Sequence, residues 1–421
     1  MSRPVTAPRG TRYLLPEDGP AWSRVEEVAR DLSGRYAFDR IETPLFERIE
    51  LFSRGLGESS DAVEKEMFRV SGAAGSEEER AEWALRPEPT AGIVRAYLEH
   101  GMHVRPGPQR LWMIGPMFRY DRPQAGRFRQ FVQWDVEVIG DAGPMVDVEV
   151  IELGHRFFAE LGVGEVVAYL NSIGDATCRP GYRAALVEYF GAHEDRLTDD
   201  SRRRLRINPL RVLDGKDLDP ELAAGAPKAL DHLCEPCRAH FDAVRALLDD
   251  LGLRYEVDNR IVRGLDYYTR TTFEFYVAGR RGQQQALGGG GRYDGLVELL
   301  GGPATPGIGF GIGIDRTVLA AAEQGVTAAA GAPLLVVVGT DPEALAPRLK
   351  VAGALRGAGL RVRVDGSPRK LGRQLESAAK LGARYAILVD PLLSSERVIL
   401  RDLQASEQRE IALDDVAASL G

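Results

Sequence analysis

Two neighbouring segments, Leu111-Trp-Met-Ile-Gly-Pro-Met-Phe-Arg119 and Gln130-Phe-Val-Gln-Trp-Asp-Val-Glu-Val-Ile139, predict a long antiparallel hairpin joined by a charged loop. Side chains alternate between the two faces of a strand, so Gln133, Asp135 and Glu137 share one face of the return strand. A polar face on a central strand is unusual, and it indicates a pocket. A half-exposed antiparallel sheet is the alternative interpretation.

A second polar stretch, Arg263-Gly-Leu-Asp-Tyr-Tyr-Thr-Arg270, precedes another alternating strand pattern. Arg263 and Asp266 are costly to bury without partners. Tyr267 and Tyr268 each join an apolar ring to a polar tip, which suits a pocket for a small polar ring. A strand entry with surface charges is the alternative interpretation.

Two glycine-rich stretches follow, Ala286-Leu-Gly-Gly-Gly-Gly-Arg-Tyr-Asp-Gly295 and Gly307-Ile-Gly-Phe-Gly-Ile-Gly-Ile-Asp-Arg316. The first allows a ligand to approach the backbone closely, although a flexible loop would have the same composition. In the second, glycine at every other position flattens one face of a strand and leaves space for a planar ligand beside Arg316. Close packing of a helix on the sheet would also require such glycines.

The composition indicates a globular protein with more than one domain. The chain has 421 residues, of which 44% are hydrophobic and 28% are charged, and this length predicts two or three domains. No apolar run approaches the roughly 20 residues of a membrane span, and the first residues lack a signal-peptide core. We therefore expect a cytoplasmic protein without membrane contact. The net charge of −8 argues against broad non-specific nucleic-acid binding.

Changes in pattern along the chain indicate the domain boundaries. Residues 175–253 are mostly helical and charged, and we interpret them as an insertion between strands. A small-residue linker spans residues 326–333, and a mostly parallel βαβαβ pattern follows in residues 334–421. The insertion contains the basic cluster of residues 202–206, which is either a local RNA-binding surface or a solvated helix end.

Three cysteines are too few for a disulfide framework. Cys234-Glu-Pro-Cys237, with His232 and His240 nearby, is compatible with a metal site. It is also compatible with the start of a helix that contains two thiols, and we favour that interpretation because no second cysteine pair is present.

Together these motifs resemble the histidyl-tRNA synthetases, a family of class II aminoacyl-tRNA synthetases, over essentially the whole chain. Residues 36–46, 117–137 and 309–316 are similar to the three class II motifs. Residues 263–268 and 289–295 are similar to the two histidine-specific motifs, which are more discriminating.

The resemblance implies an α+β protein: a class II catalytic domain with an antiparallel sheet in residues 1–325, and a C-terminal α/β anticodon-binding domain. It also implies a homodimer with the first motif at the interface. The implied substrates are L-histidine, ATP and tRNA-His, with Mg²⁺ on the nucleotide and no metal bound by a protein motif. Histidine would be activated to histidyl-adenylate and then transferred to the 3′ end of the tRNA.

The resemblance also assigns roles to individual residues. Arg263 and Arg119 would be catalytic at the α-phosphate, with Arg263 also near the substrate carboxylate. The ATP-binding residues would be Arg119, Arg127, Phe131 and Arg316, with Arg316 and Phe131 on either side of the adenine. The histidine-binding residues would be Glu88, Pro89, Thr90, Gln133, Glu137, Arg263, Tyr267 and Tyr268.

Within this set, Glu88, Thr90 and Gln133 would bind the α-amino group, while Glu137 and Tyr268 would bind the imidazole. From its sequence context alone, Thr90 is also a good N-cap for a helix starting at Ala91. Pro89 departs from the family pattern Arg-Pro-Glu-Gly-Thr, and it removes one backbone N–H from the site.

Two alternatives belong to other classes of function. One is a non-charging paralogue that acts as the regulatory subunit of ATP phosphoribosyltransferase. Residues 334–421 and the three arginines Arg119, Arg263 and Arg316 argue against it. The other is an RNA-binding module on a synthetase scaffold, which the retained pocket residues disfavour.

Overall fold

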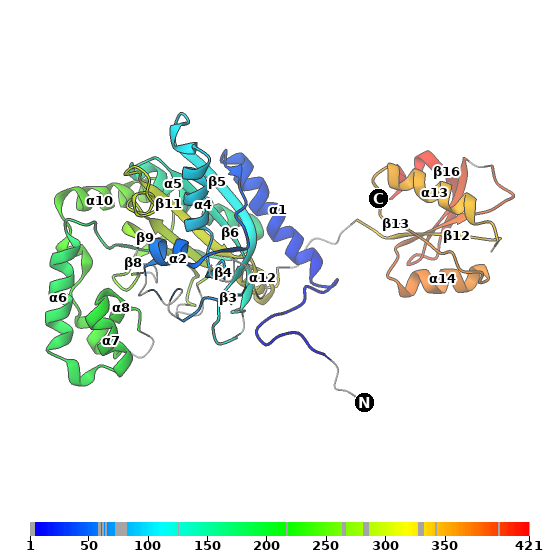
Figure 1. Cartoon of the computed structure of the whole chain (residues 1–421). Coiled ribbons are helices and arrows are strands. Elements are labelled where there is room, and N and C mark those ends of the chain that lie inside the picture. The colour runs from blue at the N-terminus through cyan, green and yellow to red at the C-terminus, as the bar shows by residue number, and fades with distance from the viewer. Residues whose placement is uncertain are drawn as a thin grey trace. The chain divides into compact units, whose positions relative to one another are not determined.

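A computed structural model describes residues 5–57, 60, 63, 65–71, 82–124, 126–215, 218–262, 267–280, 286–326, 332–341, 343–394 and 396–420. The chain divides into two compact units, Met1–Thr327 and Ala328–Gly421 (Figure 1). Arg263 and Asp266 lie outside the described residues, as does most of the predicted linker at 326–333. Within the described ranges, no helix is long and apolar enough to cross a membrane.

An eight-stranded sheet forms the centre of the first unit. Its strands pair antiparallel except at the two edges, where β1 is parallel to β5 and β8 is parallel to β7. In spatial order they are β1 (Asp39–Arg40), β5 (Gln109–Phe118), β6 (Gln130–Ile139), β11 (Gly307–Gly313), β10 (Gly288–Arg292), β9 (Thr269–Val277), β7 (Val166–Ser172) and β8 (Tyr255–Val257). The predicted hairpin is confirmed, because every residue of β5 pairs with one of β6.

The glycine run at 288–291 is an inner strand of this sheet and not a flexible loop. A Cβ on Gly290 would lie 1.9 Å from the carbonyl oxygen of Gly309 on the neighbouring strand. Because glycine has no Cβ, the backbone of β10 can approach that of β11 closely at this position.

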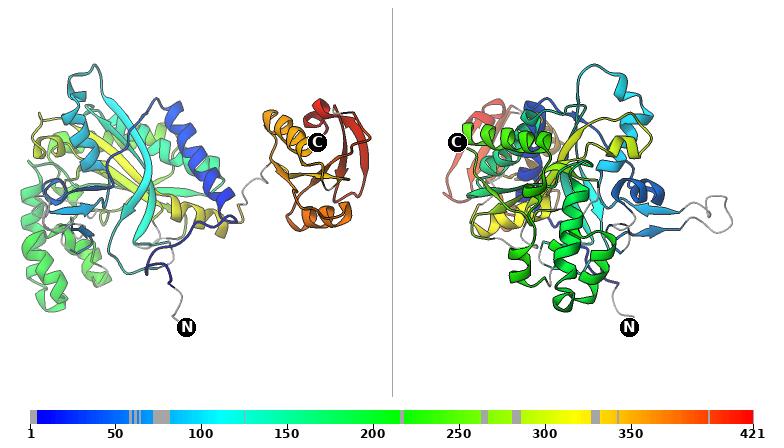
Figure 2. Two further views of the ribbon diagram at one scale, coloured as in Figure 1. Left: turned by 45° about the vertical axis from the view of Figure 1, so that its right-hand side comes forward. Right: turned by 90° about the vertical axis from the view of Figure 1, so that its left-hand side faces the viewer.

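The two faces of the sheet have opposite character. Trp134, Val136 and Val138 of β6 are fully buried in one hydrophobic core. The helices that bury this face are α1 (Gly19–Arg35), α5 (Pro144–Leu161), α10 (Glu235–Asp250) and α12 (Ile314–Glu323) (Figure 2).

The other face carries the polar side chains of β6. It also carries Leu111 and Met113 of β5, which pair directly with Glu137 and Asp135. Three helices, α2 (Ile49–Leu56), α4 (Thr90–Glu99) and α11 (Leu296–Leu299), contribute to the core on this side. A small sheet of β2 (Phe46–Arg48), β4 (Trp83–Leu85) and β3 (Arg69–Val70) accompanies them.

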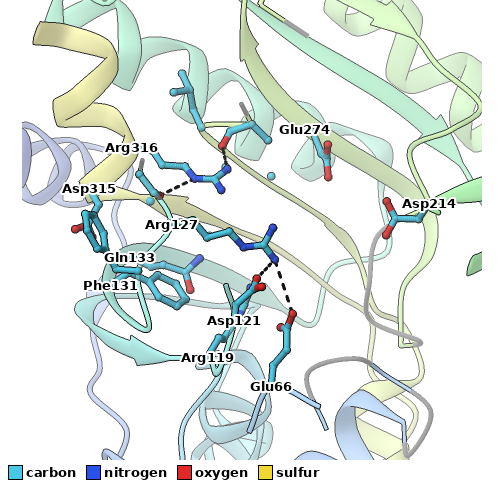
Figure 3. A pocket seen from close by; sticks show the side chains of 18 of the residues that line it. Glu66, Arg119, Asp121, Arg127, Phe131, Gln133, Asp214, Glu274, Asp315 and Arg316 are labelled. Atoms are coloured by element: carbon cyan, nitrogen blue, oxygen red, sulfur yellow. Dashed lines mark hydrogen bonds and ion pairs between the residues drawn. The ribbon is translucent and has the colours of Figure 1, made fainter. Parts of the chain in front are cut away.

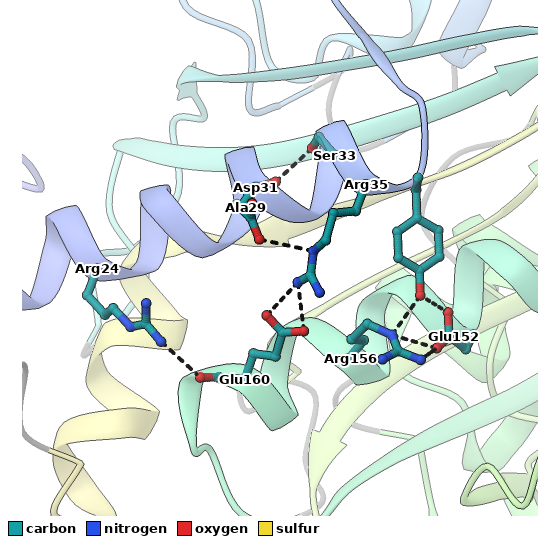
Figure 4. A network of polar contacts seen from close by, with 9 residues as sticks. Arg24, Ala29, Asp31, Ser33, Arg35, Glu152, Arg156 and Glu160 are labelled. Carbon is teal, nitrogen blue, oxygen red and sulfur yellow. Dashed lines mark hydrogen bonds and ion pairs between the residues drawn. The ribbon is translucent and has the colours of Figure 1, made fainter.

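Polar contacts tie α1 to α5 at the start of the segment 36–46 (Figure 4). Arg35 Nη2 lies 2.6 Å from Glu160 Oε2. The Tyr36 hydroxyl donates a hydrogen bond to the Glu152 carboxylate. Arg156 Nε donates a hydrogen bond to the Tyr36 hydroxyl oxygen at 2.8 Å. Burial, with the bond to Glu152, raises the pKa of Tyr36 to about 12, so this phenol remains a neutral donor.

The chain between β7 and β8 is helical, as the sequence predicts. The helices before α10 are α6 (Arg179–Gly191), α7 (Asp199–Ile207), α8 (Leu210–Leu213) and α9 (Pro220–Gly225). The basic cluster lies on α7, where Arg202 pairs with Asp199 and Arg204 pairs with Asp200 at 2.8 Å. The Arg202 side chain is partly exposed, whereas that of Arg204 is mostly buried and also donates to the backbone carbonyl of Arg211, so only part of the cluster is a solvated helix surface.

The second unit contains a five-stranded sheet covered on both faces. Its elements are β12 (Leu335–Gly339), α13 (Leu345–Gly357), β13 (Val362–Val364), α14 (Leu371–Lys380), β14 (Tyr385–Val389), β15 (Arg397–Asp402) and β16 (Gln408–Ala412). Leu335 and Val337 pack on the α13 side, while Val336 and Val338 pack on the α14 side. The parallel strands β13, β12 and β14 follow the prediction, whereas β15 and β16 add antiparallel pairs and β16 was not predicted.

Candidate active site

A cavity of about 550 Å³ opens on the polar face of the large sheet (Figure 3). Strands β6, β9, β10 and β11, the first turn of α12 and the loop between β5 and β6 contribute its walls. The predicted residues that meet here are Arg119, Arg127, Phe131, Gln133 and Arg316. Segments about 200 residues apart in the chain therefore form one site.

Backbone carbonyl groups hold the arginine side chains in place. Arg316 donates from Nε to the carbonyl of Gly126 at 3.1 Å and from Nη1 to that of Ala286 at 2.5 Å. Arg119 donates from Nε to the carbonyl of Pro87 at 2.8 Å, and its guanidinium lies 5.3 Å from the centre of the Phe131 ring.

Three arginine side chains converge on the cavity, which carboxylates also line. Burial lowers the pKa of Arg316, and the nearby charges of Arg127 and Arg119 lower it further. Arg127 is partly neutralised by ion pairs with Asp121 and, at 3.8 Å, with Glu66 (Figure 3). Three converging guanidinium groups favour a polyanionic ligand such as a triphosphate.

The alternating glycines of β11 make room for acidic side chains on β6. A Cβ on Gly309 would lie 1.9 Å from Glu137 Oε2, and one on Gly311 would lie 2.6 Å from Asp135 Oδ1. Gly309 and Gly311 pair directly with Glu137 and Asp135 in the sheet. The sequence indicated this flat surface, but not that these carboxylates cover part of it.

A buried cluster of acids and phenols lies next to the cavity. Glu137 accepts a hydrogen bond from Thr90 Oγ1 at 2.6 Å and another from Tyr293 Oη at 2.5 Å. Burial raises the pKa of Glu137 to about 8, although both hydrogen bonds oppose the shift. Burial also raises the pKa of Asp135 well above its ordinary value, with Glu137 and Glu88 adding to the effect.

Glu88 caps helix α4 from inside this cluster. Its carboxylate accepts from the backbone N–H groups of Thr90 at 2.9 Å and Ala91 at 3.1 Å. The prediction that Thr90 is the N-cap is wrong: the helix begins at Thr90, and Pro89 precedes it without a side-chain cap. Because Glu88 uses the next two amides, Pro89 removes no N–H that this cap needs.

The two predicted tyrosines pack inside the same cluster. The rings of Tyr267 and Tyr268 have centroids 4.7 Å apart, and Tyr293 lies 5.8 Å from Tyr267. All three side chains are buried. Burial raises the pKa of Tyr267 and of Tyr293, which therefore present neutral phenols at neutral pH.

Some site residues escaped the sequence prediction. Tyr293 lies in the glycine-rich segment 289–295, yet only the three-dimensional path of the chain after β10 brings its hydroxyl to Glu137. Asp135 was placed on the correct face without a role. Among the described residues, Gln133 Oε1 and Asp135 Oδ2 are buried without a hydrogen-bond partner, and Gln133, which lines the cavity, is available to a ligand.

A class II aminoacyl-tRNA synthetase is the class of protein that this sheet and its two-part site define. A profile described as histidyl-tRNA synthetase matches residues 10–174 and 197–317, and one described as anticodon binding domain matches residues 331–420. The chain belongs to the histidyl-tRNA synthetase family.

Individual relatives and a solved structure agree with this assignment. The histidine–tRNA ligase of Desulforudis audaxviator is 46% identical over 99% of this chain and 98% of its own. That of Pelotomaculum thermopropionicum is 44% identical over 98% and 96%. The crystal structure of apo S. aureus histidyl-tRNA synthetase superposes with a TM-score of 0.81 at 34% identity, covering 99% of both chains.

Proposed function

We propose that this chain activates L-histidine with ATP to histidyl-adenylate and pyrophosphate, and then transfers the histidyl group to the 3′ end of tRNA-His. The observation that supports this most directly is the adjacency of an arginine-lined cavity and a buried acidic cluster on one face of one sheet. Gln133 lines the cavity, while Glu137, four residues along the same strand, lies in the cluster.

The cavity would bind ATP. Arg119 suits the α-phosphate because a planar guanidinium binds phosphate oxygens with two parallel hydrogen bonds. Phe131 and Arg316 would hold the adenine between them, and Arg127 would assist at the outer phosphates. In-line attack by the histidine carboxylate on the α-phosphorus then requires positioning and charge neutralisation and no protein nucleophile. Arg263 remains a prediction for the opposite side of that phosphate.

The buried cluster would bind histidine. Glu88, Thr90 and Gln133 are proposed for the α-ammonium group, with Pro89 at the start of α4 beside them. Glu137 and Tyr268 are proposed for the imidazole, and Tyr267 lines the pocket. A ligand without two ring nitrogens would leave these buried polar groups without partners, and such sites discriminate by roughly 10⁴-fold.

Mg²⁺ would accompany the nucleotide phosphates and neutralise their charge. The carboxylates of Glu66 and Glu274 line the cavity and are oxygen ligands of the type that this ion prefers. Both already have partners, since Glu66 lies 3.8 Å from Arg127 and Glu274 accepts from Tyr276 Oη at 2.6 Å, so the ion would compete with these contacts.

We also propose that residues 1–325 form the catalytic domain with its insertion at about 175–253, and that residues 334–421 bind the anticodon after the linker at 326–333.

A homodimer is proposed through the segment 36–46, since Leu45 is 44% and Phe46 is 55% exposed there. Light scattering of the purified protein tests the dimer. The cytoplasmic location remains a prediction from the sequence.

Exchange of labelled pyrophosphate into ATP tests the proposed activity. We expect exchange that depends on histidine and that histidinol, which lacks the carboxylate, does not support. Equal exchange with other amino acids, or none with histidine, would contradict the proposal. Charging of a tRNA-His transcript then tests the second step separately.

A further inference from the structure

Four potential metal ligands meet outside the active site, at the two ends of the helical region. Asp175, Cys178, Cys234 and Cys237 place one ligand atom each, three thiol sulfurs and a carboxylate oxygen, within 4.8 Å of one another. They are brought together from two Asp/Cys-x-x-Cys segments 56 residues apart. We propose that these residues form a structural zinc site.

The spacing of the ligand atoms fits one tetrahedral ion. Zinc bonds sulfur at about 2.3 Å, so two thiolates on one ion lie roughly 3.8 Å apart. Asp175 Oδ1 is 3.6 Å from Cys178 Sγ and 3.8 Å from Cys234 Sγ. Small rotations of the side chains would therefore place all four atoms around a single ion.

The backbone around these four residues favours metal binding at two helix N-termini and at a glycine. Cys178 precedes helix α6 and Cys234 precedes helix α10, so both thiols lie at helix N-termini. The helix dipole at this end favours a thiolate, which is the form that binds metal. Gly174 has a φ of +68°, and a Cβ there would lie 2.3 Å from Cys178 Sγ.

A network of contacts around Asp175 supports its orientation. Oδ1, which faces the thiols, accepts from the backbone N–H of Thr177 at 2.9 Å. Oδ2 lies 3.6 Å from Arg270 Nη2 on β9. Such outer contacts orient a ligand before the ion binds.

The histidines named in the sequence analysis have other contacts. His240 Nε2 lies 2.8 Å from Asp147 Oδ2, and the ring of His232 packs against Tyr182. The cysteine pair does lie at the start of a helix, with Cys234 before α10 and Cys237 in its first turn, and Asp175 and Cys178 complete a ligand set that the sequence did not reveal.

The site would clamp the helical region to the sheet. It links the residue before α6 to the residue before α10, and so closes a chain segment of about 60 residues against the end of β7. Both helices lie on the same side of the first unit in Figure 1. Arg179, next to Cys178, donates to the backbone carbonyl of Tyr268. This hydrogen bond connects the proposed zinc site to the buried acidic cluster.

Metal analysis of the full chain tests the proposal. Untagged protein purified with a phosphine reductant and zinc, then passed through a desalting column, should retain about one zinc per chain. Cobalt in place of zinc should give thiolate-to-metal charge-transfer absorption and the intense visible bands of a tetrahedral ion. Cys237→Ser and Cys178→Ser should lose the metal, whereas Asp231→Asn, an exposed carboxylate on the same segment, should retain it.

A ligand-exchange variant keeps the test independent of folding. Asp175→Cys should retain one zinc and hold it against a higher concentration of chelator than the wild type does. No stoichiometric zinc and no thiolate–cobalt absorption in the wild type would overturn the proposal, as would a disulfide between two of these cysteines under the same reducing conditions.

Discussion

The arginine-lined cavity and the buried acidic cluster share one face of one sheet, yet they hold their charged groups in different ways. In the cavity, Arg119 and Arg316 donate to backbone carbonyl groups, while Arg127 pairs with carboxylates and its side chain remains 27% exposed. In the cluster, Glu137 is 2% exposed, and neutral hydroxyl groups supply its partners.

This difference separates the residues proposed to bind phosphate from the residues proposed to select histidine. Arginines at a half-open site attract phosphate by charge, which every ATP-dependent ligase of this class needs. A fully buried carboxylate is costly to ionise, so only a ligand that supplies matching donors relieves the cost. We therefore expect substitutions in the cavity to impair chemistry, and substitutions in the cluster to impair histidine binding.

The largest effect is expected for Arg119→Ala. Removing one cation aimed at the developing charge of a transition state costs about 10²–10³ in kcat, or roughly 2.7–4 kcal/mol. Histidine affinity should change little, because Arg119 lies in the cavity and not in the cluster. Histidine-dependent pyrophosphate exchange, fitted for kcat and KM, measures both quantities.

Arg122→Ala is the matched control. Arg122 is exposed on the same loop and does not line the cavity. Equal losses in the two variants would show that the loop, and not the Arg119 charge, supports catalysis.

A smaller and different effect is expected for Glu137→Gln. Losing a charged hydrogen-bond partner costs about 1.5–3 kcal/mol, which corresponds to a rise of roughly 10- to 100-fold in KM for histidine. The KM for ATP should stay the same. Steady-state exchange at varied histidine and varied ATP separates the two constants. Glu256→Gln serves as the control, because Glu256 is an exposed carboxylate on edge strand β8. A rise in the KM for ATP as well as the KM for histidine in Glu137→Gln would contradict the separation of the two regions.

The third comparison lies within one strand. Gly309→Ala should lower the free energy of unfolding by about 1–3 kcal/mol, because its Cβ would overlap Glu137 Oε2 and the carbonyl of Val136. Gly313→Ala should be nearly neutral, since its nearest neighbour lies at 3.6 Å. Urea denaturation of both variants measures the difference, and equal stabilities would mean that β11 shifts to accommodate the methyl group.

Much of this site was predictable where it depends on local periodicity. The alternation of side chains in β6 placed Gln133 and Glu137 on one face, and the structure has them there. The glycines of β10 and β11 were recognised as sites of close approach, although the first run was not recognised as a strand. Local patterns specify which face a side chain occupies, because that depends only on the strand's period of two.

Contacts between distant segments were less predictable. No local pattern indicates that Tyr293 meets Glu137, or that Asp175 and Cys178 meet Cys234 and Cys237. These contacts depend on strand order and on where the chain leaves the sheet. The prediction of Thr90 as an N-cap failed for a related reason: the Thr90 hydroxyl donates to Glu137, 47 residues away, and a local cap competes with that bond.

The sharpest test of the comparison is the pH dependence of histidine binding. With its pKa near 8, Glu137 holds a proton in the ligand-free protein at pH 7. A ligand that pairs with the carboxylate must displace that proton, so histidine affinity should strengthen by up to about tenfold per pH unit from pH 6 to 8 and level off above it. Calorimetric titration across this range measures the slope. Glu137→Gln has no such proton to release, so its affinity should retain only the dependence that comes from the ligand's own imidazole. Parallel curves for the two proteins would show that Glu137 is already ionised, and that the cluster binds charge in the same way as the cavity.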